Sequence, residues 1–396
     1  MLKGDFPAEK FAALRTPFYF YDLDLLKKTL AVIADEAGKD PLFRVHYAVK
    51  ANFNPAVLRI ISAAGLGADC VSGGEVAAAL EAGFPPDGIV FAGVGKSDEE
   101  IRLGLDSDIA RFNVESEAEL RVIDELAGKA GKKARISLRV NPDIGAHTHA
   151  NITTGLSENK FGINYDQLED VMKVAFSLSN VQYMGLHFHI GSQILDMGDF
   201  VALCNRINQI SSQFARHGLP TGDINVGGGL GINYQHPNHL PIADFESYFR
   251  TFREHLHLPK GTIVHFELGR SVVAPCGTLI SRVLYVKEGS SRRFAIIDAS
   301  MTELIRPALY KAYHRIENIS SDEPESTYDV VGPVCESSDV FLKGTSLDGC
   351  RRGDLIAIRS AGAYGESMSS RYNLHPLPGS AFMEGGNFKT ININRI

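Results

Sequence analysis

Short apolar segments alternate with amphipathic segments along most of the first 270 residues. Each apolar segment spans five to eight residues, as expected of a buried strand, and the stretch after it has helical periodicity. The predicted strands cover residues 44–49, 67–71, 89–93, 110–114, 136–140, 183–190, 223–227 and 263–268. Eight such units predict an α/β fold of the (β/α)8 TIM-barrel type, with an open doubly wound sheet as the alternative.

The predicted helix at 115–131 shows the amphipathic pattern clearly. Its apolar residues Leu120, Ile123, Leu126 and Ala127 fall on one side. Acidic residues crowd its first turn and a glycine follows its end, which is typical of helix termini.

The pattern changes after Arg270, where strands joined by short polar turns replace the strand–helix units. Strands are predicted within residues 278–289, 292–300, 327–334 and 353–365, with one helical stretch at 307–314. The segment FYFYD at 18–22 also reads as a strand and is expected to pair with this tail. We therefore predict a barrel at 30–270 and a mostly β domain, sandwich or Greek-key-like, from residues 1–29 and 271–396.

Composition and charge exclude several classes of protein. Apolar residues make up 44% of the chain and charged residues 22%, which is ordinary for a globular protein. The net charge is -7 and the basic residues are scattered, so no nucleic-acid partner is expected. No apolar run approaches the roughly 18 residues of a membrane span. The start, MLKGDFPAEKF, lacks the signal-peptide pattern, which predicts a cytoplasmic protein.

The cysteines point to the same compartment. The five residues Cys70, Cys204, Cys276, Cys335 and Cys350 are odd in number, far apart and without a CxxC pair. This spacing argues against a disulfide framework and against a structural zinc site.

Candidate chemistry gathers where the barrel strands end, because barrel active sites lie at the carboxyl ends of the strands. These positions hold Lys50, Asp69, His187 with His189, Gly227 to Gly229, and Glu267 with Arg270. Lys50 lies in the stretch HYAVKAN at 46–52, directly after the predicted strand 44–49. It is either a surface residue with a buried stem or a desolvated amine that takes part in chemistry.

Two glycine-containing loops are candidates for a phosphate site. NVGGGLG at 225–231 follows the seventh strand, and backbone N–H groups of such glycines cradle phosphates in many barrels. HIGSQ at 189–193 adds Ser192 after the sixth strand. A simple tight turn is the alternative reading of the glycines.

The pair His187 and His189 allows a different class of function. Histidines two apart on a strand hold metal in some barrel hydrolases. In this chain Asp69 and Glu267 could serve as further ligands. No third histidine stands at a strand end, and His187 also fits a hydrogen-bonded core histidine. A metal-dependent hydrolase is therefore the rival interpretation.

A lysine, a phosphate cradle, an aromatic ring and a carboxylate at one barrel mouth together indicate pyridoxal 5'-phosphate. The Lys50 amine would form a Schiff base with the aldehyde, and His189 would stack on the ring. Glu267 beside the ring nitrogen would keep it protonated, because an adjacent opposite charge favours the charged form.

These residues stand in motifs that run nearly end to end. They are YAVKAN (47–52), VSGGE (71–75), TGLSENKFGI (154–163), GLHFHIGSQ (185–193), GGGLG (227–231), ELGR (267–270), RPALY (306–310), GPVCESSD (332–339) and AGAYGESMSSRYN (361–373). In this combination the chain resembles the fold-type III pyridoxal-phosphate decarboxylases. One departure is Leu268 in ELGR, where the family usually has proline; we expect little functional effect.

The resemblance implies a role for each motif. The cofactor residues it implies are Lys50, His189, Ser192, Gly228, Gly229, Glu267, Gly269, Arg270 and Tyr364. The substrate residues it implies are Arg270, Arg306, Tyr310, Glu336 and Tyr364. Cys335 matches the residue proposed to return a proton to the α-carbon. In the family Cys335 and Glu336 reach the site from the partner subunit, so the resemblance implies an obligate homodimer with shared sites.

The implied reaction is decarboxylation of meso-2,6-diaminopimelate to L-lysine, the last step of lysine biosynthesis. Two arginines would clamp the distal carboxylate and Glu336 would pair with the distal ammonium. A relative acting on ornithine, arginine, carboxynorspermidine or a siderophore precursor is an alternative, as are an alanine racemase and a homologue that has lost catalysis. The loop at 142–163 is unusually long and is expected to act as a lid.

Overall fold

The computed structural model describes residues 4–142 and 160–394, and the chain forms two compact units. The first unit comprises residues 30–231 and 244–269, and the second comprises 1–29, 232–243 and 270–396. The segment 232–243 lies in the second unit, whereas the predicted barrel range included it. One reason is that Tyr234 accepts hydrogen bonds from Arg270 and Arg306 of that unit.

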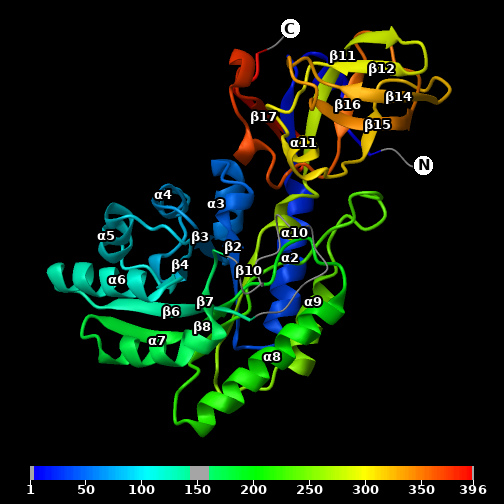
Figure 1. Cartoon of the computed structure of the whole chain (residues 1–396). Helices are drawn as coiled ribbons and strands as arrows, with labels where there is room; N and C mark the ends of the chain where they lie inside the picture. Colours follow the sequence, from blue (N-terminus) through cyan, green and yellow to red (C-terminus); the bar gives the residue numbers. More distant parts are fainter. Residues whose placement is uncertain (1–3, 143–159, 395–396) are drawn as a thin grey trace. The chain divides into compact units, whose positions relative to one another are not determined.

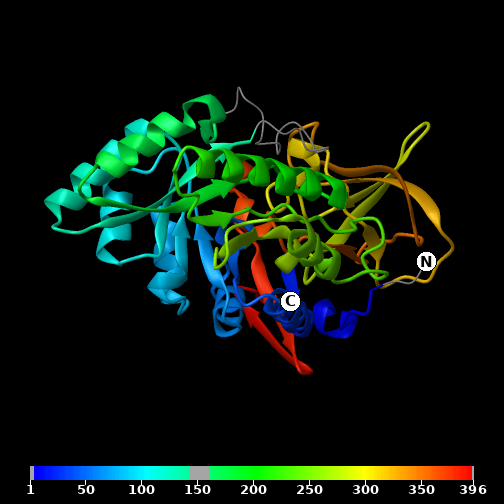
Figure 2. The same ribbon diagram turned by 90° about the horizontal axis from the view of Figure 1, so that it is seen from below.

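The first unit is a closed barrel of parallel strands with helices outside them (Figures 1 and 2). Around the barrel the order is β2, β3, β4, β5, β6, β8, β9 and β10, and β10 pairs with β2 to close it. The strands are β2 (Phe43–Ala48), β3 (Gly67–Cys70), β4 (Ile89–Phe91), β5 (Arg111–Val114), β6 (Ala134–Asn141), β8 (Val181–Phe188), β9 (Asp223–Asn225) and β10 (Val264–Leu268). The predicted TIM barrel is confirmed, and the doubly wound sheet is wrong.

Helices follow most of the strands. They are α2 (Leu23–Gly38), which leads into β2, then α3 (Pro55–Ala63), α4 (Gly73–Glu81), α5 (Asp98–Asp106), α6 (Glu117–Lys129), α7 (Tyr165–Ser177), α8 (Met197–Arg216) and α9 (Phe245–His255). The short strand β7 (Ile163–Asn164) pairs with β6. Helix α6 confirms the prediction for 115–131: Ser116 caps it by accepting the Glu119 N–H, and its four predicted apolar residues are buried.

An aromatic cluster packs α9 onto β10. The Phe266 ring lies 5.8 Å from the ring of Tyr248, 5.0 Å from that of Phe249 and 5.2 Å from that of Phe252, all in edge-on arrangements. Such aromatic pairs contribute about 0.5–1.5 kcal/mol each beyond the area they bury. This packing holds the strand that carries Glu267.

A row of buried polar side chains crosses the barrel and includes His265 of β10. The Nδ1 of His46 lies 3.0 Å from the Gly88 carbonyl, and its Nε2 lies 2.9 Å from His265 Nδ1. His265 in turn lies 3.6 Å from Asp223, which accepts a 3.1 Å bond from Arg111. Burial and the neighbouring His265 lower the pKa of His46 to about 3.

The buried His46 predicts that the protein loses stability in mild acid. The native pKa of His46 lies below its unfolded value of about 6.5, so the native state binds fewer protons and stability falls as pH drops below about 6.5. At pH 5 the loss attributable to His46 is about 2 kcal/mol. Urea unfolding at pH 7.5 and pH 5 measures it, and His46→Gln should show a smaller difference between the two midpoints. An equal pH difference in the variant would contradict the assignment.

The second unit is built around a mixed sheet. Its strands are β1 (Phe18–Asp22), β11 (Gly277–Glu288), β12 (Arg293–Ile297), β13 (Ile316–Asn318), β14 (Ser326–Val331), β15 (Val340–Leu347), β16 (Leu355–Ile358), β17 (Gly379–Glu384) and β18 (Asn387–Ile391). The main path runs β15-β14-β12-β11-β1-β17-β18, and β16 joins β11 to β13. The prediction that 18–22 pairs with the tail is confirmed, because β1 lies between β11 and β17.

Short helices complete this unit. They are α1 (Ala8–Ala12), α10 (Arg270–Val273) and α11 (Arg306–Tyr310), the last overlapping only the first part of the helical stretch predicted at 307–314. The core of this unit combines residues from the N-terminal and C-terminal parts of the sequence, because Phe11, Phe18 and Phe20 pack with Ile280 and Leu355.

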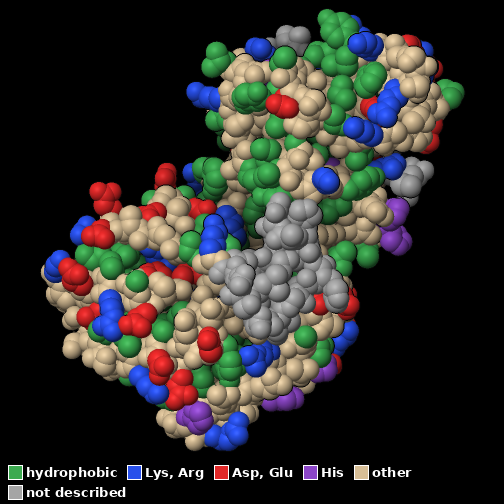
Figure 3. Space-filling view, in the orientation of Figure 1, with side chains coloured by type: hydrophobic (Ala, Val, Ile, Leu, Met, Phe, Trp, Pro, Cys, Tyr) green, Lys and Arg blue, Asp and Glu red, His purple; other side chains and the backbone are tan. Residues whose placement is uncertain are grey.

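Charged side chains of both signs share the described surface. Figure 3 shows acidic and basic side chains interspersed over the visible face of the barrel unit. Helices α5 and α6 carry exposed ion pairs such as Arg102–Asp98 and Arg121–Glu117. None of the helices in the described part of the chain has the length and apolarity that a bilayer crossing requires. The expected lid at 142–163 falls mainly on 143–159, outside the described residues.

Candidate active site

Lys50 lies one turn beyond the end of its strand. β2 ends at Ala48, and Lys50 sits in the 3-10 turn Val49–Ala51. Asn54 then caps α3 by accepting the Ala56 N–H, so the backbone is fixed on both sides of the lysine. The Lys50 side chain is 40% exposed, and its Nζ lies 3.7 Å from Asp69 Oδ2, whose side chain is 1% exposed. The amine is therefore held near a buried carboxylate while staying accessible to a reactant.

Glu267 is held by three side chains of the barrel. Its Oε1 accepts bonds from Asn113 Nδ2 at 3.1 Å and Asn225 Nδ2 at 2.7 Å, and its Oε2 lies 3.0 Å from His187 Nε2. Burial raises the pKa of Glu267, but His187 and the Lys50 ammonium outweigh burial, and the pKa falls well below its usual value. Glu267 is thus an ionised carboxylate inside the barrel.

Asp69 behaves differently from Glu267. Burial and the Glu267 charge raise its pKa, and the Lys50 ammonium only partly opposes them. Its Oδ1 is buried and has no hydrogen-bond partner among the described residues. The pKa values of these two barrel carboxylates are therefore shifted in opposite directions, as at sites where one carboxyl group acts as an acid and another as a base.

His187 and His189 have different environments. His187 is buried against Glu267, which agrees with the reading of a hydrogen-bonded core histidine. His189 follows the end of β8, and its Nδ1 accepts the Gly228 N–H at 3.3 Å. Burial, together with the Arg139 and Lys50 charges, lowers the pKa of His189 well below its usual value. His189 is therefore a neutral imidazole.

The glycine loop after β9 packs tightly on its neighbours. A Cβ at Gly228 would lie 1.8 Å from the Glu267 carbonyl oxygen, so only glycine fits there. The loop also pairs with the one after β8, because the Ile194 N–H bonds to the Gly229 carbonyl at 2.9 Å. Gly228, Gly229 and Ser192 thus lie on two linked loops beside His189. Gly269, after β10, packs against Ala48 and Ala51 at the turn that carries Lys50.

The second unit contains a cluster of arginines and tyrosines. The Arg270 guanidinium lies 4.9 Å from the centre of the Tyr364 ring, and that of Arg306 lies 6.0 Å from the rings of Tyr310 and Tyr364. Both arginines are buried. Arg306 makes no ion pair with a carboxylate within the described residues. Buried guanidinium groups of this kind require an anion or another acceptor.

Cys335 and Glu336 lie exposed on the loop after β14. Asp339 shapes this loop, since its carboxylate accepts the N–H groups of Met301 at 2.7 Å and Val334 at 2.9 Å. The Cys335 N–H in turn bonds to Asn373 Oδ1 at 3.0 Å. The thiol and the Glu336 carboxylate are therefore presented to the outside of this chain.

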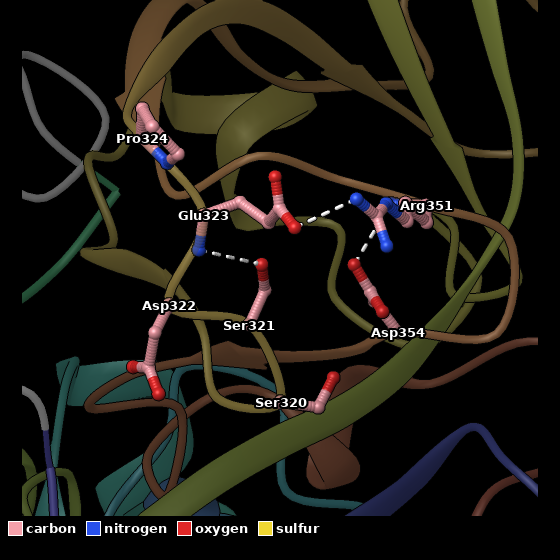
Figure 4. A pocket seen from close by; sticks show the side chains of 7 residues that line it. All are labelled: Ser320, Ser321, Asp322, Glu323, Pro324, Arg351 and Asp354. Carbon is pink, nitrogen blue, oxygen red and sulfur yellow. Dashed lines mark hydrogen bonds and ion pairs between the residues drawn. The ribbon is translucent and has the colours of Figure 1, made fainter.

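A separate surface pocket of about 440 Å³ lies in the same unit. Figure 4 shows Glu323 and Arg351 pointing toward each other across it, 2.6 Å apart. Its lining residues are Ser320, Ser321, Asp322, Glu323, Pro324, Arg351 and Asp354. None of them is a predicted site residue, and its lining carries three carboxylates (Asp322, Glu323 and Asp354) against one cation, Arg351.

The structure thus brings the predicted residues together in groups. Lys50, His189, Gly228 and Glu267 gather in the barrel unit. Arg270, Arg306, Tyr310 and Tyr364 gather in the second unit, which also carries the loop with Cys335 and Glu336.

Sequence reasoning missed Asn113, Arg139 and Asn225 in the barrel, and Tyr234 and His314 in the second unit. The first three were detectable, since each is a polar residue near the carboxyl end of an otherwise apolar strand. Tyr234 gave no such signal, because it lies on an irregular segment.

Comparison with known proteins identifies the class. The model of a family described as pyridoxal-dependent decarboxylase, pyridoxal binding domain, matches residues 27–274. Because this match covers more than half of the chain, the chain belongs to the pyridoxal-dependent decarboxylases. The metal-hydrolase interpretation of His187 and His189 is therefore wrong.

Relatives narrow the assignment within that family. A diaminopimelate decarboxylase of Bacteroides thetaiotaomicron is 60% identical over 377 residues, which is 95% of this chain and 98% of the relative. One from Aquifex aeolicus is 40% identical over 95% of this chain and 88% of its own length. The crystal structure of diaminopimelate decarboxylase from Helicobacter pylori complexed with L-lysine matches with a TM-score of 0.90 and 39% identity, covering 97% of this chain and 95% of that one. The chain is a member of the diaminopimelate decarboxylases.

Proposed function

We propose that the chain decarboxylates meso-2,6-diaminopimelate to L-lysine and carbon dioxide, with pyridoxal 5'-phosphate as cofactor. The observation that carries the choice of substrate is the buried Arg306, which lies beside Arg270 in a cluster of phenol rings. A distal carboxylate satisfies these cations. An amino acid whose distal end is a bare ammonium leaves them without an anion and brings a like charge near them.

The barrel residues fit the cofactor. Both lone pairs of Glu267 Oε1 are used by Asn113 and Asn225, while Oε2 has one donor, His187, and can accept one more. A protonated pyridine nitrogen is such a donor, and the ionised carboxylate keeps it protonated. Gly228 lets the loop after β9 approach the Glu267 backbone closely, and backbone N–H groups of such a glycine loop would bind the phosphate. When bound, the cofactor withdraws electrons from the carbon that loses carbon dioxide.

The protein's own groups have distinct tasks in this proposal. The Lys50 amine holds the cofactor covalently, and the neutral His189 ring covers its face. Ser192, Gly228 and Gly229 bind the phosphate together with Tyr364, while Gly269 allows close packing against the turn of Lys50. In the second unit, Arg270, Arg306 and Tyr310 hold the distal carboxylate of the substrate, and Glu336 holds the distal ammonium.

The substrate panel tests this function. The loaded protein is given meso-diaminopimelate, ornithine, arginine and lysine separately, and the products are separated by chromatography. We expect L-lysine from diaminopimelate and turnover of the other three at least about 10⁴-fold lower. Preferential turnover of another amino acid would retain the fold and the cofactor but overturn the substrate. The LL isomer of diaminopimelate is the matched control, because it lacks the D-centre from which carbon dioxide is lost.

We further propose a homodimer in which the partner supplies Cys335 and Glu336. Two features support it: the thiol and carboxylate are exposed, and apolar side chains lie exposed near Asn373, which bonds to Cys335. Leu374 is 94% exposed, and Tyr372 and Leu377 are about half exposed. Large apolar side chains gathered on one segment are typical of interfaces. The free cysteines, four of them buried, also favour a reducing compartment such as the cytoplasm.

Subunit complementation tests the shared site. Lys50→Ala and Cys335→Ala chains are each expected to be impaired by about 10²-fold or more. When the two are co-expressed, half of the random dimers are mixed, and each mixed dimer has one site with both residues intact. About a quarter of wild-type activity should therefore return. Activity no greater than that of the parents, with mixed dimers verified by two affinity tags, would contradict the shared site.

A further inference from the structure

Tyr234 joins the two buried arginines of the second unit. Its hydroxyl oxygen lies 2.8 Å from Arg270 Nη1 and 3.4 Å from Arg306 Nη2. The Arg306 guanidinium also lies 5.6 Å from the centre of the Tyr234 ring. Tyr234 comes from the segment 232–243, far from either arginine along the chain. One phenol therefore fixes the separation of the two cations.

The direction of these bonds follows from the chemistry of the groups. A guanidinium has donors and no acceptor, so Tyr234 accepts both bonds with its oxygen. A phenol oxygen has two lone pairs, and both are then used. The O–H hydrogen remains as a donor. Burial raises the pKa of this hydroxyl, but the two guanidiniums outweigh burial and lower it below its ordinary value, which strengthens the O–H as a donor to an anion.

His314 fixes Arg306 from the other side. Its Nε2 accepts the Arg306 Nε–H at 3.2 Å, and its Nδ1 donates to the Arg359 carbonyl at 2.9 Å. Burial and the Arg306 charge lower the pKa of His314 to about 3, so the ring is neutral and serves as an acceptor. Its ring also meets that of Tyr234 edge-on, with centres 5.0 Å apart. Arg306 is thus prevented from turning away before an anion arrives.

We propose that Tyr234 is a specificity-determining residue that donates its O–H to the distal carboxylate of the substrate, alongside Arg270 and Arg306. This inference rests on the proposed function and adds a neutral donor to its two cations. Ligands with a carboxylate at that end gain this hydrogen bond, and ligands ending in a bare ammonium do not. Tyr234 therefore helps to select amino acids whose distal carbon carries both an ammonium and a carboxylate.

The variant Tyr234→Phe removes the hydroxyl and keeps the ring that packs on His314. Because a hydrogen bond to a charged group is worth about 1.5–3 kcal/mol, we expect the KM for meso-diaminopimelate to rise about 10–100-fold. We expect kcat to change less than about threefold, because the lost contact is made equally before and during reaction. Tyr285→Phe is the matched control, since Tyr285 is also an arginine-stacked phenol, 4.9 Å from Arg352, but is exposed.

Ligand binding separates a recognition role from a merely structural one. L-lysine retains the distal carboxylate, whereas cadaverine is the same diamine without it. In Tyr234→Phe the dissociation constant of L-lysine should rise about 10–100-fold and that of cadaverine should change less than about threefold. Equal weakening of both ligands, or no change in either, would overturn the inference. Failure of the wild-type protein to turn over diaminopimelate would instead overturn the proposed function, so the two failures are distinguishable.

Discussion

Lys50→Ala should abolish decarboxylation, lowering kcat at least about 10³-fold. The expectation follows from the position of Lys50, whose side chain is 40% exposed while its Nζ lies 3.7 Å from the buried Asp69 carboxylate. Such an amine is both accessible and electrostatically held, as a covalent cofactor anchor requires. The measurement is lysine production over time at saturating diaminopimelate and cofactor.

Lys50→Arg sharpens this test, because it retains the positive charge beside Asp69 but has no amine that condenses with an aldehyde. It should be as inactive as Lys50→Ala. The control is Lys173→Ala, which removes an exposed lysine that pairs with Glu169. If Lys50→Arg kept more than about a tenth of wild-type activity, Lys50 would contribute charge and not a covalent link.

Glu267→Gln should lower kcat about 10²–10³-fold while leaving the KM nearly unchanged. Glutamine retains the shape of the side chain and can still accept from Asn113 and Asn225, but it places an amide where the carboxylate oxygen meets His187. Without the negative charge, a buried pyridinium loses its proton more easily and withdraws electrons less strongly. The pH titration of the bound cofactor's absorbance should shift in the same variant.

The matched control for this change is Glu169→Gln. Glu169 also faces a histidine, with 2.9 Å between its Oε2 and His217 Nδ1, but the pair is solvent-exposed. Removing that charge should leave both kcat and the absorbance titration unchanged. A Glu267→Gln protein with wild-type kcat would show that the carboxylate does not control the ring nitrogen.

The barrel was predictable because its signal is repeated. Each of its eight strands is a short apolar run followed by an amphipathic helix, and errors at single ends, such as β8 stopping at Phe188, do not change the count. The second unit was predicted less completely. The strand β13 has only three residues, and β15 is interrupted by Gly344 with a φ of 62°. The hairpin of β17 and β18 was detectable from Gly385-Gly386, a turn that favours two-residue hairpins.

The candidate site was predictable where chemistry coincides with regular structure. Lys50, Asp69 and Glu267 follow from one rule, that polar residues at the carboxyl ends of barrel strands serve the site. Asn113 and Asn225 obey the same rule, but neutral amides carry no distinctive signal in a sequence, and only their bonds to Glu267 reveal their role. Tyr234 depends on a long-range contact with Arg270 and Arg306. Such contacts are set by the fold and leave no local pattern in the sequence.

Chemical trapping of the cofactor tests the central claim most directly. The loaded protein is reduced with borohydride, digested and analysed by peptide mass spectrometry. We predict a pyridoxyl group on Lys50, and the label should disappear when diaminopimelate turnover is abolished by Lys50→Arg. A label on another lysine, for example Lys96, which is buried against Glu119, would contradict the account. So would the absence of any label in protein that decarboxylates diaminopimelate.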